Sequence, residues 1–326
     1  PTAASGQAVE RLAARVRASL RRLAPEAEVA VFASSACLRG GAFAVAVPDV
    51  DVVVSCSPAI LADRLCSAGG GRSRALQGHR QLQKAALRAI TDRLIASGDF
   101  KFRRSAFSAE EPKVTLLAAD GDIAVPFDIA VNSPAPLHNG ALLTECGRLD
   151  ARARALVLLT RRWARDRGIC HAAKGNLPPY CWTLLAIYFL QVGGEQVLPA
   201  LDGFVSNLAA GAAATPRGGE AAEGQTVGSL FRGFVAFYNS RFSVKDEAVS
   251  VRLGQRAPPA ARLRPKTEAA PAIEDPFDES NNLAATMTAE GYARFREELA
   301  RARGAGLVRA LRRTGPCGAR SLAALP

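Results

Sequence analysis

Segments with the pattern of β-strands largely disappear after about residue 140 of this 326-residue chain, and helical patterns fill most of the rest. Four apolar runs, at 28–35, 49–56, 113–120 and 122–132, are typical of strands. Helical spacing of apolar residues predicts helices at 8–24, 58–96, 149–169, 178–192, 226–242 and 289–303, and the Ala/Gly-rich stretch 203–225 predicts a loop. This order predicts an α+β fold, with a mixed sheet and helices over 25–140 and a mostly helical domain over 141–326. The helix within 1–24 is expected to pack on the second domain.

The charge of the chain favours a polyanionic partner. Lysine and arginine outnumber aspartate and glutamate by 42 to 30, which makes the formal net charge +12. Drift toward arginine explains the choice of Arg over Lys but not this excess, and an excess of cations favours nucleic acid through neutralisation of its phosphates. No apolar run is long enough to span a bilayer, so we expect no membrane partner.

Two aspartates interrupt the apolar run VPDVDVVVSC at 47–56. Asp49 and Asp51 are two residues apart, so a strand would point both side chains to one face, where like charges repel each other. Asp128 lies in another apolar run, VPFDIAVN. Three carboxylates on strands that can be sheet neighbours are the oxygen ligands that Mg²⁺ takes. The alternative is that each aspartate merely ends a strand or caps a turn, which is common for one such residue and uncommon for three.

A segment of small residues, FASSACLRGG at 32–41, precedes the aspartate pair. Its backbone N–H groups and the hydroxyls of Ser34 and Ser35 would be able to approach phosphates closely. FASS followed by DVD resembles the signature of the DNA polymerase β-like nucleotidyltransferases, a small-residue turn and then D-x-D on the next strand. Four later segments resemble, in order, those of the terminal uridylyltransferases and noncanonical poly(A) polymerases: FDIAVNSPAPLHNGALL, RALVLLTRRWARDRGICHAAKGNLPPYCWTLLAIYFLQ, TVGSLFRGFVAFYNSRF and IEDPFDESNNLA. The chain is small, without a large insertion between Asp51 and Asp128. In this respect it most resembles the minimal mitochondrial, editosome-associated uridylyltransferases of trypanosomatids.

The resemblance implies a bilobal nucleotidyltransferase whose N-terminal domain is a polymerase β-like palm and whose helical domain, similar to PAP-associated domains, recognises the nucleotide. The active site would lie in the cleft between them. Asp49 and Asp51 would hold two Mg²⁺ ions, for which Mn²⁺ is an alternative. Asp128 would hold one ion and help to deprotonate the RNA 3′-hydroxyl. Ser34 and Ser35 would contact the nucleotide phosphates.

Further nucleotide-binding residues are implied by the same resemblance. Asn139, which precedes Gly140 in the segment LHNG, would hydrogen-bond the ribose 2′-hydroxyl; its alternative is a helix N-cap. Arg161 and Arg165 share a helix face at i,i+4 spacing and would grip the triphosphate, unless that face is only a solvated basic one. Tyr180 would stack on the base, and its alternative is a core tyrosine at a helix start.

The segment IEDPFDESNN resembles the base-recognition loop of the family. Asp275 and Asp278 would face the base, and a carboxylate accepts from uracil N3–H but meets a lone pair at adenine N1. Many uridylyltransferases have in this loop a histidine that obstructs adenine, and its nearest counterpart is Asn281. Discrimination then rests on few contacts, so UTP is favoured over ATP without excluding ATP. The alternative is a Pro-bounded Asx turn with solvated acids.

The expected function is therefore template-independent addition of UMP from UTP to a single-stranded RNA 3′ end, with release of pyrophosphate. One alternative is the same chemistry with ATP, as in a noncanonical poly(A) polymerase, and another is a catalytically silent RNA-binding scaffold. A protein complex such as an editosome-like assembly is a further expected partner. The chain begins at Pro1 and its one methionine is Met287, so we expect a fragment or processed form. A mitochondrial location is expected from the resemblance alone, with the cytoplasm as the alternative.

Overall fold

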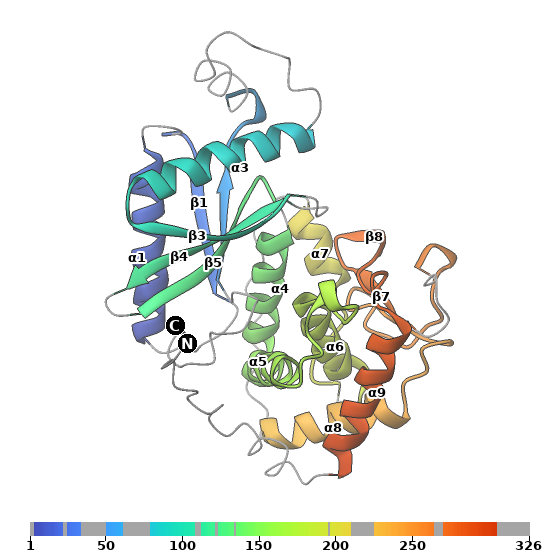
Figure 1. The fold of residues 1–326 in the computed structure, drawn as a ribbon. Coiled ribbons are helices and arrows are strands. Elements are labelled where there is room, and N and C mark those ends of the chain that lie inside the picture. Colours follow the sequence, from blue (N-terminus) through green and yellow to red (C-terminus); the bar gives the residue numbers. More distant parts are fainter. Residues whose placement is uncertain are drawn as a thin grey trace. The chain divides into compact units, whose positions relative to one another are not determined.

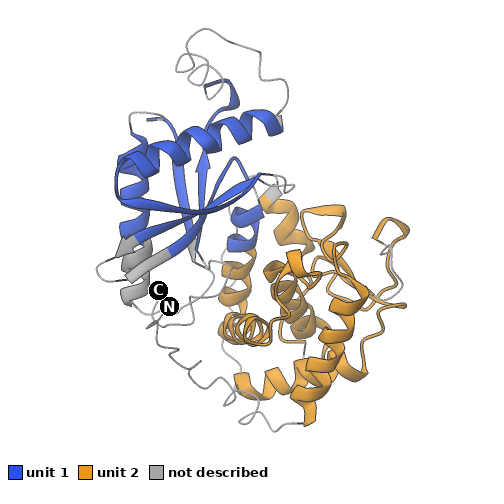
Figure 2. Ribbon diagram, in the orientation of Figure 1, with its two compact units in different colours: residues 1–141 blue, residues 142–326 orange. Residues whose placement is uncertain are grey.

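The computed structural model describes residues 3–21, 25–33, 50–60, 79–107, 112–120, 123–133, 135–194, 196–209, 225–263 and 270–304. The chain divides into two compact units, residues 1–141 (unit 1) and 142–326 (unit 2), which Figure 2 colours separately. Their boundary falls inside helix α4 (Ala135–Leu149). In the described part of the chain, no helix is both long and apolar enough to cross a membrane.

Unit 1 contains a five-stranded mixed sheet (Figure 1). Its strands are β1 (Glu28–Ala33), β2 (Val50–Ser55), β3 (Phe100–Ala106), β4 (Lys113–Asp120) and β5 (Ile123–Val131), in the spatial order β1-β2-β5-β4-β3. The central pair, β2 and β5, is parallel, and the other neighbours are antiparallel. Helices α1 (Ala3–Leu20) and α3 (His79–Ala96) pack against the sheet. The α+β fold predicted from the sequence is confirmed.

One face of this sheet forms the hydrophobic core of unit 1. Alternate residues of β2, namely Val50, Val52 and Val54, are buried together with Leu12, Val16 and Leu20 of α1 and with Leu87, Ile90 and Leu94 of α3. Because side chains alternate along a strand, Asp51 and Val53 belong to the opposite face. Helix α1 is thus part of unit 1. Its apolar residues Leu12, Val16 and Leu20 contribute to the core of this unit, and the expected packing of the first helix on the helical domain stays a prediction.

Several elements were not predicted, namely helix α4, strand β3, a helix near residue 205 and three short strands within 248–282. Strand β3 was missed because only its first residue, Phe100, is well buried, while Lys101, Phe102 and Arg103 are exposed at the edge of the sheet. An edge strand packs along one side only, so its sequence lacks the apolar alternation of a half-buried strand. Helix α7 (Asp202–Ala209) occupies the beginning of the stretch predicted as a loop, and its Val205 reaches the core.

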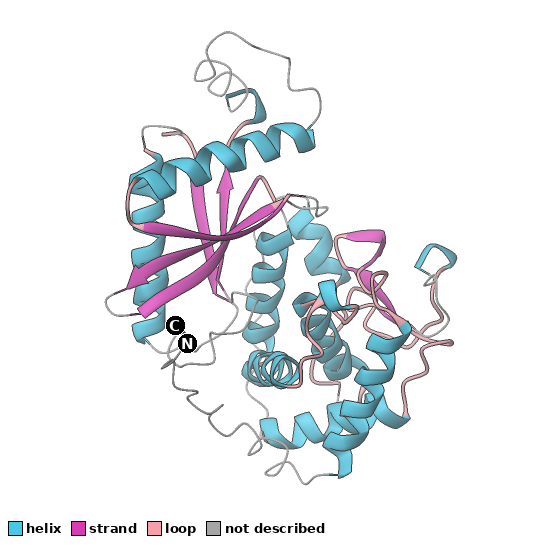
Figure 3. Cartoon of the chain, viewed as in Figure 1, coloured by secondary structure: helices cyan, strands magenta, loops and turns pink. Residues whose placement is uncertain are grey.

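Unit 2 is mostly helical, and Figure 3 shows its one small sheet among the described residues. Besides α7, its elements are α5 (Ala151–Asp166), α6 (Pro179–Val192), α8 (Val227–Ser240), α9 (Ala289–Gly304), the 3₁₀ turns Ala172–Lys174 and Ala261–Leu263, and strands β6 (Ala248–Val249), β7 (Ala272–Asp275) and β8 (Asp278–Asn282). Asp150 caps α5 through the backbone N–H of Arg152, at 2.8 Å. Helix α6 begins at Pro179, where the sequence predicted its first turn, and is buried on nearly every side.

Candidate functional site

Asp51 and Asp128 lie side by side in unit 1. They are register partners in the parallel pair β2–β5, and Thr115 of β4 is the antiparallel partner of Asp128. All three therefore belong to the face of the sheet that is opposite the hydrophobic core. The two acids that the sequence places 77 positions apart are brought together by strand pairing alone. We call this polar side of β2, β5 and β4 the carboxylate face.

Both carboxylate oxygens of Asp128 have partners. The hydroxyl of Thr115 donates to Oδ1 at 2.5 Å, and the ammonium Nζ of Lys113 lies 2.7 Å from Oδ2. Arg104 Nε donates in turn to the Thr115 hydroxyl at 3.1 Å. The side chain of Asp128 is only 4% exposed, whereas that of Lys113 is 43% exposed. A nearly buried carboxylate is thus stabilised by two direct contacts and by one contact through Thr115.

The charged groups of this face shift the pKa of Lys113. Burial alone would lower its pKa, but the negative charge of Asp128, its hydrogen bond and the charge of Asp51 together raise the pKa above its usual value. Arg104 acts in the opposite direction, through repulsion. Lys113 is therefore an ammonium at neutral pH, and it offsets part of the negative charge that Asp51 and Asp128 bring to the face.

The carboxylate face fits a divalent cation in its chemistry. Asp51 and Asp128 offer carboxylate oxygens from adjacent strands, which are the ligands that Mg²⁺ prefers. Among the described residues, no group of three or more Asp, Glu, His or Cys is placed to hold a metal. The third predicted ligand, Asp49, lies outside the described residues, as do Ser34 and Ser35. Two of the three predicted ligands are therefore brought together, and the assignment of the third stays a prediction.

Asn139 and Gly140 lie within α4 and not at its start. Asn139 is the fifth residue of the helix, so the alternative role as an N-cap does not fit. Its Oδ1 atom is buried and has no hydrogen-bond partner among the described residues. A buried amide oxygen without a partner is uncommon and marks a position where a ligand hydroxyl could donate.

Arg161 and Arg165 lie on the same helix, α5, in unit 2. Arg161 is 8% exposed and Arg165 is half-buried. An arginine that is only 8% exposed does not belong to a solvated basic face, which was the alternative for this pair. Arg162, between them, is the exposed one, and it pairs with Asp166 at 2.8 Å. The exposed side of α5 thus carries the Arg162–Asp166 ion pair, whereas Arg161 and Arg165 are less accessible to solvent.

Tyr180 and Asp275 are brought near each other inside unit 2, although α6 and β7 are distant in sequence. The Tyr180 ring packs against the hydrophobic core of this unit, and its hydroxyl is buried without a hydrogen-bond partner among the described residues. Burial, followed by the negative charge of Asp275, raises the pKa of Tyr180 well above its ordinary value. A neutral aromatic side chain therefore lies within electrostatic reach of a carboxylate.

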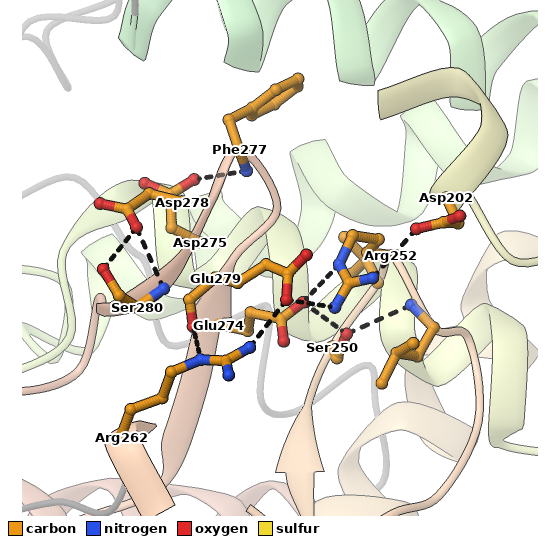
Figure 4. A network of polar contacts seen from close by, with 12 residues as sticks. Asp202, Ser250, Arg252, Arg262, Glu274, Asp275, Phe277, Asp278, Glu279 and Ser280 are labelled. Atoms are coloured by element: carbon orange, nitrogen blue, oxygen red, sulfur yellow. Dashed lines mark hydrogen bonds and ion pairs between the residues drawn. The ribbon is translucent and has the colours of Figure 1, made fainter. Parts of the chain in front are cut away.

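Strands β7 and β8 form a hairpin that carries the predicted base-recognition acids. Asp275 Oδ1 accepts from the backbone N–H of Phe277 at 3.0 Å, and Asp278 Oδ1 accepts from that of Ser280 at 3.0 Å (Figure 4). Both acids thus form Asx turns, as the alternative interpretation expected. Asp278 is exposed, and hydrogen bonds from the hydroxyl and backbone of Ser280 lower its pKa. Asp275 is half-buried, and Asn281 Nδ2 lies 3.5 Å from its Oδ2.

Arg252 connects this hairpin to the rest of unit 2. Its guanidinium lies 3.2 Å from Glu274 of β7, 3.2 Å from Glu279 of β8 and 3.0 Å from Asp202 of α7 (Figure 4). Glu274 is 4% exposed and also accepts from the Ser250 hydroxyl at 2.7 Å. Arg252 therefore connects both strands of the hairpin to α7.

Sequence reasoning did not single out the cations of these networks. Lys113 and Thr115 alternate along KVTLLAAD with the buried residues Val114 and Leu116. That alternation is the signal that would have placed both of them on one polar face beside Asp128. Arg252 lies in a stretch with no periodic pattern, and no comparable signal marks it.

Comparison with known proteins agrees with this arrangement. Residues 226–281 match the Cid1 family poly A polymerase domain. The chain is 28% identical over 188 residues to poly(A) RNA polymerase GLD2-A of Xenopus laevis, a match that covers 55% of the chain and 37% of the relative. It is 27% identical over 316 residues to terminal uridylyltransferase cid1 of Schizosaccharomyces pombe, covering 87% of the chain and 70% of the relative. The chain therefore spans little more than a third of the length of GLD2-A.

Solved structures of the Cid1 poly(U) polymerase share the fold. A histidine-to-asparagine mutant bound to MgATP matches with a TM-score of 0.66 and 22% identity over 94% of this chain and 89% of that one. A complex with the UTP analogue UMPNPP matches with a TM-score of 0.62 and 21% identity, covering 93% and 87%. The resemblance to terminal uridylyltransferases and noncanonical poly(A) polymerases is confirmed. The closer similarity to the trypanosomatid enzymes stays a prediction.

Proposed function

We propose that this chain, a nucleotidyltransferase of the terminal uridylyltransferase and noncanonical poly(A) polymerase type, adds UMP from UTP to the 3′-hydroxyl of RNA and releases pyrophosphate. The observation that carries the proposal is the pairing of Asp51 with Asp128 on the carboxylate face. Two acids on the polar side of adjacent strands are costly for a structural sheet, because they repel each other and are poorly solvated. The arrangement is expected of a site that holds cations.

The residues present suit Mg²⁺ or Mn²⁺, which would be held by Asp51, Asp128 and, as the sequence predicts, Asp49. When bound, the metal would activate the attacking oxygen and neutralise the charge of the leaving pyrophosphate. In the reaction, the 3′-oxygen of RNA forms a bond to the α-phosphorus of UTP while the bond to pyrophosphate breaks. Asp128 would receive the proton of that hydroxyl. Much of the remaining rate enhancement would come from the positioning of two anionic substrates.

The nucleotide would be recognised by the residues that the resemblance assigns to it. Asn139 would accept from the ribose 2′-hydroxyl, Arg161 and Arg165 would bind the triphosphate, and Ser34 and Ser35 would contact it through small-residue backbone. Tyr180 would stack on the base. Asp275 is the better placed acid for the uracil N3–H, because it is half-buried within electrostatic reach of Tyr180 while Asp278 is exposed. Asp278 would act mainly by shaping the hairpin, or through water.

ATP is the second candidate nucleotide, and one observation favours it. Asn281 stands at the place that the sequence analysis matched to an adenine-obstructing histidine, and it lies 3.5 Å from Asp275. An asparagine side chain obstructs adenine less than a histidine ring would, so the chain would discriminate less between the two bases. We retain UTP as the preferred nucleotide because Asp275 is the half-buried acceptor.

The test is extension of a short single-stranded RNA with magnesium and each NTP supplied separately, read on a denaturing gel. We expect extension mainly with UTP, and a loss of about 100-fold or more in Asp128→Asn. Asp92→Asn is the matched control, because Asp92 is an exposed acid on α3 of the same unit. Extension mainly with ATP would overturn the choice of base. No extension with any nucleotide would favour the RNA-binding scaffold.

A mitochondrial location and a partner complex of the editosome type belong to the same proposal. They are supported only by the resemblance of the sequence to the minimal trypanosomatid uridylyltransferases. The net charge of +12 supports RNA as a binding partner, since a strongly basic chain binds phosphates. Fractionation of cells followed by affinity purification of the chain from the mitochondrial fraction tests both parts.

A further inference from the structure

Both oxygens of Asp128 have protein partners, and one of these partners is a cation, which repels any metal ion that approaches the same oxygen. Oδ1 accepts from Thr115 at 2.5 Å, and Oδ2 lies 2.7 Å from Lys113 Nζ. If Asp128 is a metal ligand, as the proposed function requires, the charge repulsion between the metal and the ammonium favours a departure of Lys113 when the metal binds. The structure distinguishes the two partners clearly.

Thr115 is the fixed partner. It is 3% exposed, and its hydroxyl is held from the other side by Arg104 Nε at 3.1 Å. The register of β3 and β4 shifts between Phe102 and Arg104, and this bulge places Arg104 opposite Thr115. Bulges commonly turn a side chain toward a functional site. The hydrogen bond of Thr115 to Oδ1 is thus supported by a second residue and by the backbone of an adjacent strand.

Lys113 is the partner that can leave. It is the first residue of β4, its side chain is 43% exposed, and its flexible four-carbon stem ends in a single charged group. It needs no repacking to turn away, since much of the side chain already faces solvent. Only the Asp128 end of this ion pair is buried, and Thr115 continues to donate to that carboxylate when Lys113 turns away.

We propose that the Lys113 ammonium is a place-holding cation, which occupies Oδ2 of Asp128 in the metal-free protein and is displaced when the divalent cation binds. This inference rests on the proposed function, because it takes Asp128 as a ligand. Lys113 stabilises the metal-free carboxylate face, where Asp51 and Asp128 are adjacent and would otherwise repel each other. The same contact weakens metal binding, since the metal competes with the ammonium for one oxygen.

The test measures metal binding by the full chain without nucleotide or RNA. Free Mn²⁺ is followed by its electron paramagnetic resonance signal during titration of the protein, so no catalytic activity enters the readout. Lys113→Met removes the ammonium and keeps most of the stem. Lys101→Met is the matched control, because Lys101 is an exposed lysine of the neighbouring strand β3 and gives the same change in net charge. Lys113→Arg keeps a cation at the position.

We expect Lys113→Met to tighten the apparent dissociation constant for Mn²⁺ about fivefold, the factor for one partly exposed ion pair. Lys101→Met should change it less than about twofold, because exposed charges at a distance are screened by salt. Lys113→Arg should leave binding unchanged or weaker. Equal constants for wild type, Lys113→Met and Lys101→Met would overturn the place-holding role.

Asp128→Asn separates this inference from the proposed function. If wild type binds Mn²⁺ and Asp128→Asn weakens binding while Lys113→Met has no effect, the metal site stands and the place-holding role fails. If Asp128→Asn binds Mn²⁺ as well as wild type, the metal assignment of the proposed function itself fails. Thermal unfolding without metal gives a second readout, in which Lys113→Met is expected to be less stable than wild type and Lys101→Met unchanged.

Discussion

Replacement of Arg252 by methionine tests how the base-recognition hairpin is stabilised. Arg252 contacts three carboxylates from three elements, but only one of them is buried: the side chain of Glu274 is 5% exposed, against 59% for Asp202 and 49% for Glu279. Methionine keeps the apolar stem of the arginine and removes its charge. Glu274 is then left in the interior, where the Ser250 hydroxyl still donates a hydrogen bond to it.

The expected loss of stability follows from this difference in burial. The two exposed pairs should contribute less than about 1 kcal/mol each. Loss of the partner of a buried charge costs about 3–5 kcal/mol, and the Ser250 hydroxyl, which still donates to Glu274, reduces that cost. We therefore expect Arg252→Met to lower the free energy of unfolding of unit 2 by about 3 kcal/mol. Adding Glu274→Gln should recover most of this loss, because no unpaired buried charge remains.

Urea unfolding followed by tryptophan fluorescence is the suitable assay. The chain has two tryptophans, and both Trp163 and Trp182 lie in the hydrophobic core of unit 2, so the signal reports on this unit. Arg262→Met is the control, because Arg262 pairs with the exposed Glu279, and it should cost less than about 1 kcal/mol. The argument is refuted if Arg252→Met costs no more than Arg262→Met, or if Glu274→Gln does not rescue it. A rise in the KM for UTP should accompany the loss, because Asp275 follows Glu274 directly in β7.

Two further predictions concern the same hairpin. Asn281→His should obstruct adenine and so raise the preference for UTP over ATP, measured as the ratio of kcat/KM values, about tenfold. Asn281→Ala should leave this ratio unchanged. An unchanged ratio in the histidine variant would contradict the assignment of this position. Ser280→Ala should destabilise the protein at pH 7, because Ser280 lowers the pKa of Asp278 and so stabilises the fold above the ordinary pKa of 3.8. That contribution disappears as pH falls through the lower folded-state value, so urea unfolding at pH 3 and pH 7 should show a difference that shrinks in acid; a difference independent of pH would count against it.

Much of the local structure was readable from the sequence. The apolar alternation around Asp51, the acidic interruption at Asp128 and the prolines before α6 all predicted elements that the structure contains. These signals are periodicities of neighbouring residues, or turn and cap preferences, which act over a few positions. Strand β3 carries no such signal, because apolar and polar residues need not alternate along an exposed edge strand. Helix α7 lies in an Ala/Gly-rich stretch whose composition favoured a loop.

The candidate site was likewise predicted only in part from the sequence. That acids would lie on strands could be inferred from the sequence, and the resemblance to a known family named their roles. Which groups surround them could not be inferred, because the register of β2 with β5 and of β5 with β4 decides that Lys113 and Thr115, rather than other polar residues, contact Asp128. Likewise, Arg252 meets Glu274, Glu279 and Asp202 only after three separate elements have packed. The pattern of a strand is local, whereas the partner of a charge depends on chain segments that meet only in the folded protein.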